Sequence, residues 1–344
     1  MMVWHPGRAL LVLLALACAL PSAALTFSGK LDELTPRSLA LRLADGRVID
    51  ALLPRTPLPE IASIGTGDSV ETDCKRIKPV WEPEASRYRF LEVTAIRLLV
   101  HEPPEHRPSA APTPPADDPT MAHAREVNLS YAAQLPNYVA DETAVRYTRD
   151  SASKKWRRFD TIQDEIAIRG GHATRQGIVR NGKLTHDAFE RLSGFKWSGG
   201  FGTELRPVFD PRCPTRIEYA GDAAATGGDL AEYRFESPAH ACFVPFYFEF
   251  ERYNPARTGH VDVDKRGRVV RFLEEARAFP PAFEFSGRTE EIYWSDVTIA
   301  GSQHLLPIRA VFVVVYSSGV GWRVEVAYKN HRHFEASTTI VPLL

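Results

Sequence analysis

"HLLPIRAVFVVVY", residues 304–316, and "GWRVEVAYKN", residues 321–330, are separated only by a short turn that contains glycine. In both stretches apolar side chains recur at every second position, which is the spacing that places side chains on one face of a β-strand. "EEIYWSDVTIA", residues 290–300, precedes them with the same pattern after the turn "GSQ". Long strands joined by short turns pair antiparallel. We therefore expect one wide antiparallel sheet whose apolar face points inward.

The segment that leads into this sheet has helical spacing. In "MAHAREVNLSYAAQLPNYV", residues 121–139, Val127, Tyr131 and Leu135 recur every fourth position until Pro136 ends the pattern. The chain beyond it is expected to be mainly strands, with a hairpin turn at Asn181-Gly182. The predicted class of residues 121–344 is thus α+β, mainly antiparallel β, with one entering helix.

A smaller β domain is expected before this region. Residues 25–100 contain five short strand-like runs, a number that favours a closed barrel of OB type, with an SH3-like barrel as the alternative. Residues 101–120 are rich in proline, so we interpret them as an extended linker between the two domains.

The first residues predict export. An apolar run of about a dozen residues follows Arg8 and ends in "PSAA", which is typical of a signal peptide cleaved near Ala24 and is too short to span a bilayer. Lipoprotein processing at Cys18 is the alternative. We expect a periplasmic or secreted bacterial protein, peripheral to a membrane at most. The sequence does not indicate an oligomeric state.

The charge balance argues against nucleic acid as a partner. The formal net charge is -1, with 42 Lys and Arg against 43 Asp and Glu. A protein that binds nucleic acid usually carries a basic surplus that contacts phosphates. The barrel domain is therefore expected to be an interaction or structural module.

Three cysteines remain after the predicted signal peptide. Cys213 opens one strand-like run and Cys242 closes the next, so a hairpin of the two would bring these residues together in a disulfide. Two separately buried thiols are the alternative. Cys74 alternates with Val70 and Thr72, which predicts a buried position on a strand.

Few stretches hint at chemistry. Asp262, Asp264 and Gly267 begin like a calcium loop, but the fifth and twelfth loop positions are Arg266 and Leu273, so the ligand set is incomplete and we expect a hairpin turn. We expect His331 and His333 to be surface residues and Glu249 and Glu251 to form the polar side of a strand. The glycine-rich residues 193–205 are expected to form a rim or lid. The sequence thus predicts no metal site, no cofactor and no catalytic residue, while an envelope hydrolase that uses Glu249 and Glu251 stays open.

The second region resembles a known family. The helix ending "YAAQLPNY", the strand "W..FDTI.DEI" and the closing series "GHVDVDKRGRVVRFLEEA", "YWSDVTIAGSQHLLPIRA" and "VAYKNHRHFEASTTI" together resemble exported bacterial proteins with the architecture of LolA, LolB and the RseB sensor domain. The resemblance implies an open half-barrel of antiparallel strands, plugged by helices, that handles acyl chains or lipidated proteins.

A ligand face follows from the resemblance and the alternation together. Eight apolar residues on alternate strand positions are candidates to line the concave face, although simple core packing would use the same residues. These candidates are Phe246, Phe248, Phe250, Trp294, Phe312, Trp322, Val324 and Val326. We expect a noncatalytic carrier or sensor of a lipid or lipidated protein, with a structural or protein-interaction module as the alternative.

Overall fold

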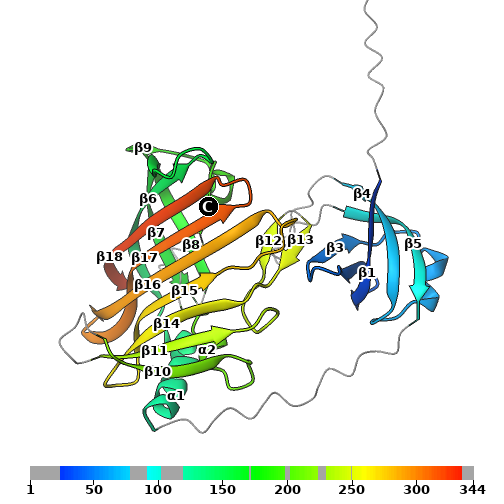
Figure 1. Cartoon of the computed structure of the whole chain (residues 1–344). Helices are drawn as coiled ribbons and strands as arrows, with labels where there is room; N and C mark the ends of the chain where they lie inside the picture. The colour runs from blue at the N-terminus through cyan, green and yellow to red at the C-terminus, as the bar shows by residue number, and fades with distance from the viewer. Residues whose placement is uncertain are drawn as a thin grey trace, which may run out of the picture. The chain divides into compact units, whose positions relative to one another are not determined.

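The computed structural model describes residues 24–77, 91–101, 119–169, 172–197, 202–223, 230–248 and 250–334. The predicted signal peptide, Cys18 and most of the predicted linker lie outside these residues. The chain splits into two compact units, one of residues 1–43 and 49–105 and one of residues 44–48 and 106–344 (Figure 1). No helix of the described residues is long and apolar enough to cross a membrane.

The first unit is a small β structure whose strands form a partial ring. β1 pairs antiparallel with both β2 and β4, β4 pairs with β5, and a parallel contact between Leu52 and Glu92 joins β3 to β5. Its described elements are β1 (Leu25–Leu34), β2 (Ser38–Arg42), β3 (Val48–Leu52), the 3-10 helix η1 (Pro59–Ser63), β4 (Ser69–Arg76) and β5 (Leu91–Val100). Cys74 is a free, buried thiol on β4, as its alternation predicted, and burial raises its pKa to about 11.

The second unit is built on one open antiparallel sheet of 11 strands, in the order β10-β11-β14-β15-β16-β17-β18-β6-β7-β8-β9 (Figure 1). The strands are β6 (Tyr138–Arg149), β7 (Arg157–Arg169), β8 (His172–Arg180), β9 (Lys183–Leu184), β10 (Arg216–Asp222), β11 (Leu230–Ser237), β14 (Arg257–Asp264), β15 (Val269–Ala276), β16 (Phe285–Ile299), β17 (Ser302–Tyr316) and β18 (Gly321–His333). The described chain is thus mainly β with few helices, and the predicted antiparallel sheet is confirmed.

The alternation that predicted the sheet also sets which side chains point inward. On β17, Ala310, Phe312 and Val314 are buried, whereas the residues between them are partly exposed. Phe312 lies opposite Val324 of β18, which is fully buried. Because the side-chain period of a strand is two, this register brings the apolar positions of neighbouring strands onto one face.

Two predicted hairpin turns have the expected backbone. Asn181 and Gly182, between β8 and β9, have φ angles of 50° and 79°, as a type I′ turn requires. Gly267 has φ 77° in the turn between β14 and β15, and its N-H donates to the carbonyl of Asp264 at 2.9 Å. The Asp264 carboxylate accepts hydrogen bonds from the backbone N-H groups of Arg266 and Arg268, so it stabilises the turn.

Of the predicted stripe, Tyr131 and Leu135 pack against the core, and the entering helix α1 (Pro119–Gln134) has in addition a second, more deeply buried row. Met121, Ala124 and Asn128 are its most buried residues, whereas Val127 is only half-buried. Polar contacts of Asn128 explain this second row. The Asn128 side-chain amide donates to the carbonyl of Gly267 at 2.8 Å, and its oxygen accepts from the N-H of Val269 at 3.1 Å. A buried asparagine therefore fixes α1 against the β14–β15 turn.

One prediction about the sheet is wrong. Phe246, Phe248 and Phe250 were expected on alternate positions of one strand of the sheet, but their stretch, "FVPFYFEFERY" (residues 243–253), turns at Phe250 and forms the short hairpin β12 (Phe246–Phe248) and β13 (Glu251–Tyr253) outside the 11-stranded sheet. Alternation alone reports that one face is apolar. It does not report where the strand breaks.

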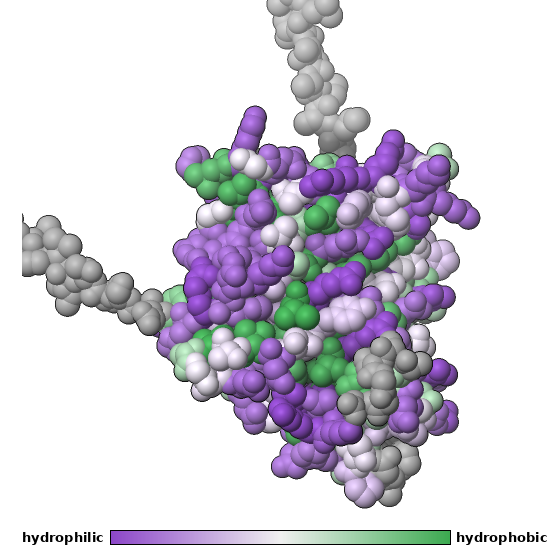
Figure 2. All heavy atoms as spheres, turned by 90° about the vertical axis from the view of Figure 1, so that its left-hand side faces the viewer, coloured by the Kyte–Doolittle hydropathy of each residue, from purple (hydrophilic) through white to green (hydrophobic). Residues whose placement is uncertain are grey.

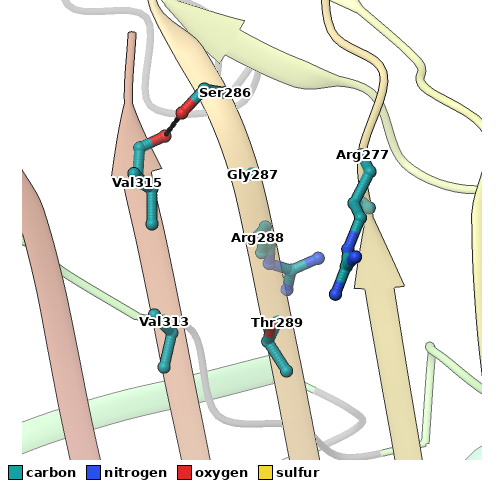
Figure 3. A pocket seen from close by; sticks show the side chains of 8 residues that line it. Arg277, Ser286, Gly287, Arg288, Thr289, Val313 and Val315 are labelled. Carbon is teal, nitrogen blue, oxygen red and sulfur yellow. Dashed lines mark hydrogen bonds between the residues drawn. The ribbon is translucent and has the colours of Figure 1, made fainter. Parts of the chain in front are cut away.

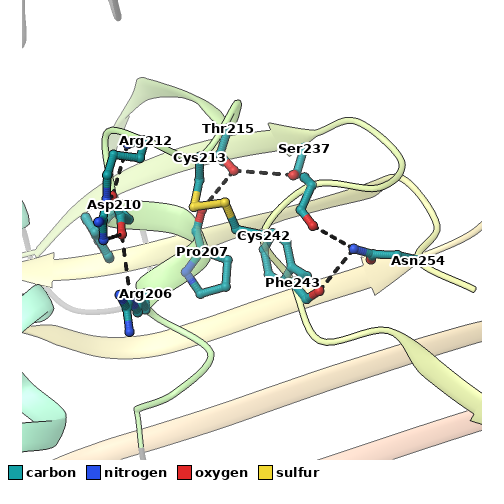
Figure 4. Close-up of a disulfide and its surroundings, with 12 residues drawn as sticks. Arg206, Pro207, Asp210, Arg212, Cys213, Thr215, Ser237, Cys242, Phe243 and Asn254 are labelled. Carbon is teal, nitrogen blue, oxygen red and sulfur yellow. Dashed lines mark hydrogen bonds and ion pairs between the residues drawn. A yellow bond between two sulfur atoms is a disulfide. The ribbon is translucent and has the colours of Figure 1, made fainter. Parts of the chain in front are cut away.

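A disulfide joins Cys213 and Cys242, with 5.6 Å between their Cα atoms (Figure 4). β10 and β11 form the hairpin on which that pairing was predicted. Beside it, the hydroxyl of Thr215 donates to the carbonyl of Pro207 at 2.8 Å. Pro207 belongs to the short helix α2 (Arg206–Phe209), so the bridge and this hydrogen bond tie α2 to the β10–β11 end of the sheet.

Candidate ligand-binding face

Four of the eight predicted ligand residues meet on the inner face of the sheet. Trp294 lies on β16, Phe312 on β17, and Val324 and Val326 on β18, and these strands are neighbours. None of the four is more than 4% exposed, and all belong to one hydrophobic core. The structure thus brings them together on one apolar surface, and it fills that surface with the chain's own side chains.

Trp322 lies at the rim of this surface. Its ring is half-buried and meets the ring of Phe159 edge to face, with 4.9 Å between the centroids. Gly194 approaches the same indole so closely that a Cβ at that position would lie 2.9 Å from the Trp322 ring. Trp322 therefore contacts the segment that covers the inner face.

The three remaining candidates are elsewhere, which corrects the prediction of a single aromatic face. Phe246 and Phe248 of the β12–β13 hairpin contact a separate aromatic cluster, with Phe246 5.0 Å from Phe279 and Phe248 5.9 Å from Phe285 between ring centroids. Phe250 is buried at the turn of the hairpin. None of these three residues belongs to the hydrophobic core of the large sheet.

Two segments cover the inner face, and we call them together the cover. They are α1 and the described part of residues 186–209, which contains the 3-10 helix η2 (Phe189–Arg191) and α2 (Figure 1). The core residues that the cover supplies are Met121, Ala124, Phe189, Leu192, Trp197, Leu205, Val208 and Phe209. The glycine-rich stretch predicted as a rim or lid is part of this cover, although residues 198–201 lie outside the described ones.

Arg146 fastens the cover to the sheet, and Arg125 joins the two segments of the cover. The Arg146 guanidinium, on β6, donates to the carbonyl of Phe195 at 3.1 Å. Arg125, on α1, donates to the carbonyl of Phe209 at 2.8 Å. Such side-chain bonds to backbone oxygens hold an irregular segment without a continuous ladder of backbone hydrogen bonds.

The inner face also carries buried charge, which sequence reasoning missed. Arg146 is fully buried and pairs with Asp160 of β7 through two hydrogen bonds of 2.7 and 2.6 Å. Arg180 of β8 donates to the same carboxylate at 2.7 Å. This group is well paired, since two guanidinium groups share one carboxylate.

A second buried group lies on β14, β15 and β16. Arg257 donates to Glu274 at 2.6 Å, and Arg288 contacts both Glu274, at 3.3 Å, and Glu290. Glu274 and Glu290 are directly opposite each other and nearly inaccessible. Burial raises the pKa of Glu290 to about 8; Arg288 opposes this rise, and Glu204 and Glu274 add to it.

The third group is the least satisfied. Glu142 of β6 and Asp164 of β7 are opposite each other, and Arg175 of β8 donates to Glu142 at 3.3 and 3.2 Å. The Asp164 side chain has no exposed surface, and neither of its oxygens has a hydrogen-bond partner among the described residues. Its nearest cation is Arg175, at 3.7 Å. Burial, together with the charge of Glu142, raises the pKa of Asp164 to about 7.

A signal for these acids was present in the sequence. On β6, Glu142 alternates with Ala140 and Ala144, and on β7, Asp164 alternates with Ile162 and Ile166. A period of two therefore placed both carboxylates on the inner face beside apolar residues. Counting apolar positions alone left them out.

Two pockets adjoin these groups, and a third lies along α1. A pocket of about 480 Å³ lies between β8 and residues 185–191 and is lined by Arg175, Ile178 and Phe189 among others. A pocket of about 260 Å³ lies where β15 ends beside β16, and the side chains of Arg277 and Arg288 lie next to each other there (Figure 3). A third, of about 220 Å³, lies along α1 and is lined by Val127, Tyr131, Leu135 and Leu305 among others.

The other candidates take ordinary structural places. His331 is half-buried, and its Nε2 lies 3.2 Å from the carbonyl of Pro307, so it is not the fully solvated surface residue that we expected. His333 is exposed. Glu251 lies on the β12–β13 hairpin, and Glu249 lies outside the described residues. No group of three or more His, Cys, Asp or Glu in the described chain is arranged to hold a metal ion.

The outer surface differs from the inner face. The side of the molecule shown in Figure 2 is mostly hydrophilic, with hydrophobic residues in separate patches. The apolar residues of the sheet's inner face, in contrast, belong to one buried cluster beneath the cover.

Comparisons with known proteins give one likeness. No family model and no curated protein sequence matches the chain. Among solved structures, the LolA superfamily protein NE2245 from Nitrosomonas europaea is similar, with 10% sequence identity and a TM-score of 0.29 over 63% of this chain and 93% of that chain.

Proposed function

We propose that this chain is a noncatalytic carrier or sensor of the bacterial cell envelope that binds the hydrophobic part of a lipid or lipidated protein on the inner face of its 11-stranded sheet. The disulfide between Cys213 and Cys242 supports an oxidising compartment outside the cytoplasm. The signal peptide predicted at residues 1–24 supports the periplasm or the exterior.

One observation carries the proposal. The apolar face of an 11-stranded sheet is covered by α1, of 16 residues, and by an irregular segment whose described part contains helices of only 3 and 4 residues. A ligand chain that replaces this segment would gain about 0.8 kcal/mol of binding free energy for each CH2 group that it buries. The exchange of one apolar cover for another leaves the sheet itself intact.

The strand pairings of the first unit support a barrel of OB type for residues 25–100. β1 pairs with β2 and with β4, and β3 pairs with β5 in parallel, which favours a partly open barrel of this kind over the SH3-like alternative. We assign it an interaction or structural role, because its charge balance argues against nucleic acid.

A glycine in the cover makes the binding proposal testable. Gly194 has φ 89°, and a Cβ there would lie 2.9 Å from the Trp322 ring and 3.1 Å from the Arg146 guanidinium. Gly194→Ala should push this part of the cover away from the sheet and favour the open state. Gly182→Ala is the matched control, because Gly182 has φ 79° but nothing within 4 Å of the added Cβ.

The measurement is titration with a fluorescent long-chain alcohol, whose head group is uncharged. We expect the parent protein to bind it and Gly194→Ala to bind it about fivefold more tightly, since a shift of about 1 kcal/mol toward the open state raises affinity by that factor. Gly182→Ala should bind like the parent. If no variant binds the probe, the proposal is wrong.

A structural or protein-interaction module is the second candidate function. The observation that favours it is that the inner face is already filled by the cover's own side chains. In that case Gly194→Ala lowers stability, as Gly182→Ala does, and neither variant gains affinity for the fluorescent alcohol.

A further inference from the structure

The unsatisfied carboxylate of Asp164 points to the chemical class of the ligand's head group. From the arrangement around it we propose that the third buried group, Glu142, Asp164, Arg175 and Tyr328, receives a cationic head group, such as a primary ammonium, from the amphiphile that binds the inner face. This inference rests on the proposed function and specifies the polar end of the same ligand.

The charges of the group favour a cation. Glu142 and Asp164 supply two carboxylates, and Arg175 supplies one positive charge. Arg175 is itself committed, because it donates two hydrogen bonds to Glu142 and its guanidinium lies 4.2 Å from the centre of the Phe189 ring. When Asp164 is ionised, one negative charge is therefore left without a hydrogen-bonded partner among the described residues.

Independently of the clustering of acids, the Asp164 carboxylate is buried without a hydrogen-bond donor in the described part of the chain. A buried carboxylate without a hydrogen-bond donor is unfavourable, so such groups are rare unless a ligand, an ion or a proton satisfies them. An ammonium group would donate to the free oxygens and neutralise the charge. The remaining neighbour, Tyr328 of β18, lies opposite Glu142 and is uncharged at neutral pH, since burial raises its pKa further.

The position of the group fits the polar end of an amphiphile. Asp164 alternates along β7 with Ile162 and Ile166, both fully buried, so a chain bound along the inner face would place its head beside the carboxylate. Phe189 and Trp197 of the cover stand over Arg175, at 4.2 and 5.7 Å from its guanidinium. Opening the cover would therefore uncover the head-group site and the apolar face together.

A way in from solvent lies beside the site. The pocket of about 480 Å³ between β8 and residues 185–191 includes Arg175 and Phe189 in its lining. Its other charged or titratable lining residues are His186, Asp187, Glu190 and Arg191. These residues carry both signs of charge, so the selection for a cation is assigned to Asp164 and not to the pocket's mouth.

The test compares three amphiphiles of equal chain length that differ only in the head group: a primary amine, an alcohol and a carboxylate. At about pH 8, where Asp164 is ionised, we expect the amine to bind about tenfold or more tightly than the alcohol, as a charge-assisted hydrogen bond provides. The carboxylate should bind most weakly. At about pH 5, Asp164 is protonated and the preference for the amine over the alcohol should shrink.

Two variants test whether Asp164 causes the preference for the amine over the alcohol. Asp164→Asn should abolish the discrimination between amine and alcohol while leaving the affinity for the alcohol unchanged. Asp141→Asn, an exposed carboxylate on the neighbouring strand, should retain it. If Asp164→Asn keeps the preference, or if the alcohol binds as well as the amine, the head-group inference is overturned and the proposed function stands. If none of the three amphiphiles binds, the proposed function fails as well.

Discussion

Asp164→Asn should stabilise the folded protein at alkaline pH and do so far less in acid. Asp164 has a folded pKa of about 7 against an ordinary value of 3.8, because its carboxylate is buried beside Glu142. Between these two values the folded state binds more protons than the unfolded state. The free energy of unfolding therefore falls as the pH rises from about 4 to about 7 and is constant, as far as this group is concerned, at higher pH. Asparagine cannot ionise, so the variant loses this dependence.

The magnitude follows from the two pKa values. Each tenfold change in proton affinity corresponds to about 1.4 kcal/mol, so ionised Asp164 costs the folded state on the order of 4 kcal/mol relative to its protonated form. Burying the asparagine amide has a cost of its own, about 1–3 kcal/mol, but that cost does not depend on pH. The difference between the stability change at about pH 8 and that at about pH 4.5 should therefore be about 3 kcal/mol.

Urea denaturation at the two pH values measures this difference directly. Asp141→Asn is the control, because Asp141 is exposed, its pKa is lowered by hydrogen bonds from Asn330 and Arg332, and its loss should change stability by less than about 1 kcal/mol. Equal destabilisation by Asp164→Asn at both pH values would refute the reasoning, because it would mean that Arg175 compensates the ionised carboxylate fully.

Two further variants test the contacts that hold the second unit together. Asp160→Ala leaves the fully buried Arg146 without its carboxylate partner and should lower the free energy of unfolding by about 3–5 kcal/mol in urea denaturation, whereas Asp150→Ala, which breaks an exposed pair with Arg157, should cost less than about 1 kcal/mol. A small loss at Asp160 would show that Arg146 finds another partner. Joint replacement of Cys213 and Cys242 by serine removes a bridge between residues 29 apart and should cost about 3–4 kcal/mol, and an unchanged urea midpoint would contradict this.

The sheet could be predicted from the sequence because its signal is local. The alternation in residues 290–330 fixes which side chains of β16, β17 and β18 point inward, and the short turns between them fix the antiparallel order. The Asn181-Gly182 turn could be predicted for the same reason. A positive φ at both positions needs only these two residues.

The remaining features depend on contacts between distant segments. The break at Phe250 was not predicted, and the buried row of α1 that contains Asn128 was missed because Asn128 is positioned by a turn that lies about 140 residues further along the chain. The other members of the Asp164 group, Glu142, Arg175 and Tyr328, come from three other strands, so no single stretch of sequence displays the group. Alternation did place the carboxylate on the inner face, and reading polar as well as apolar residues in that register would have found it.

The central claim is that the cover moves away from the inner face of the sheet so that a ligand can bind there. Peptide-resolved hydrogen–deuterium exchange with and without a long-chain primary amine tests this claim. We predict that the amine increases exchange in residues 186–197 and 202–209 while it protects β16, β17 and β18. Unchanged exchange in the cover at a saturating amine concentration would contradict the account.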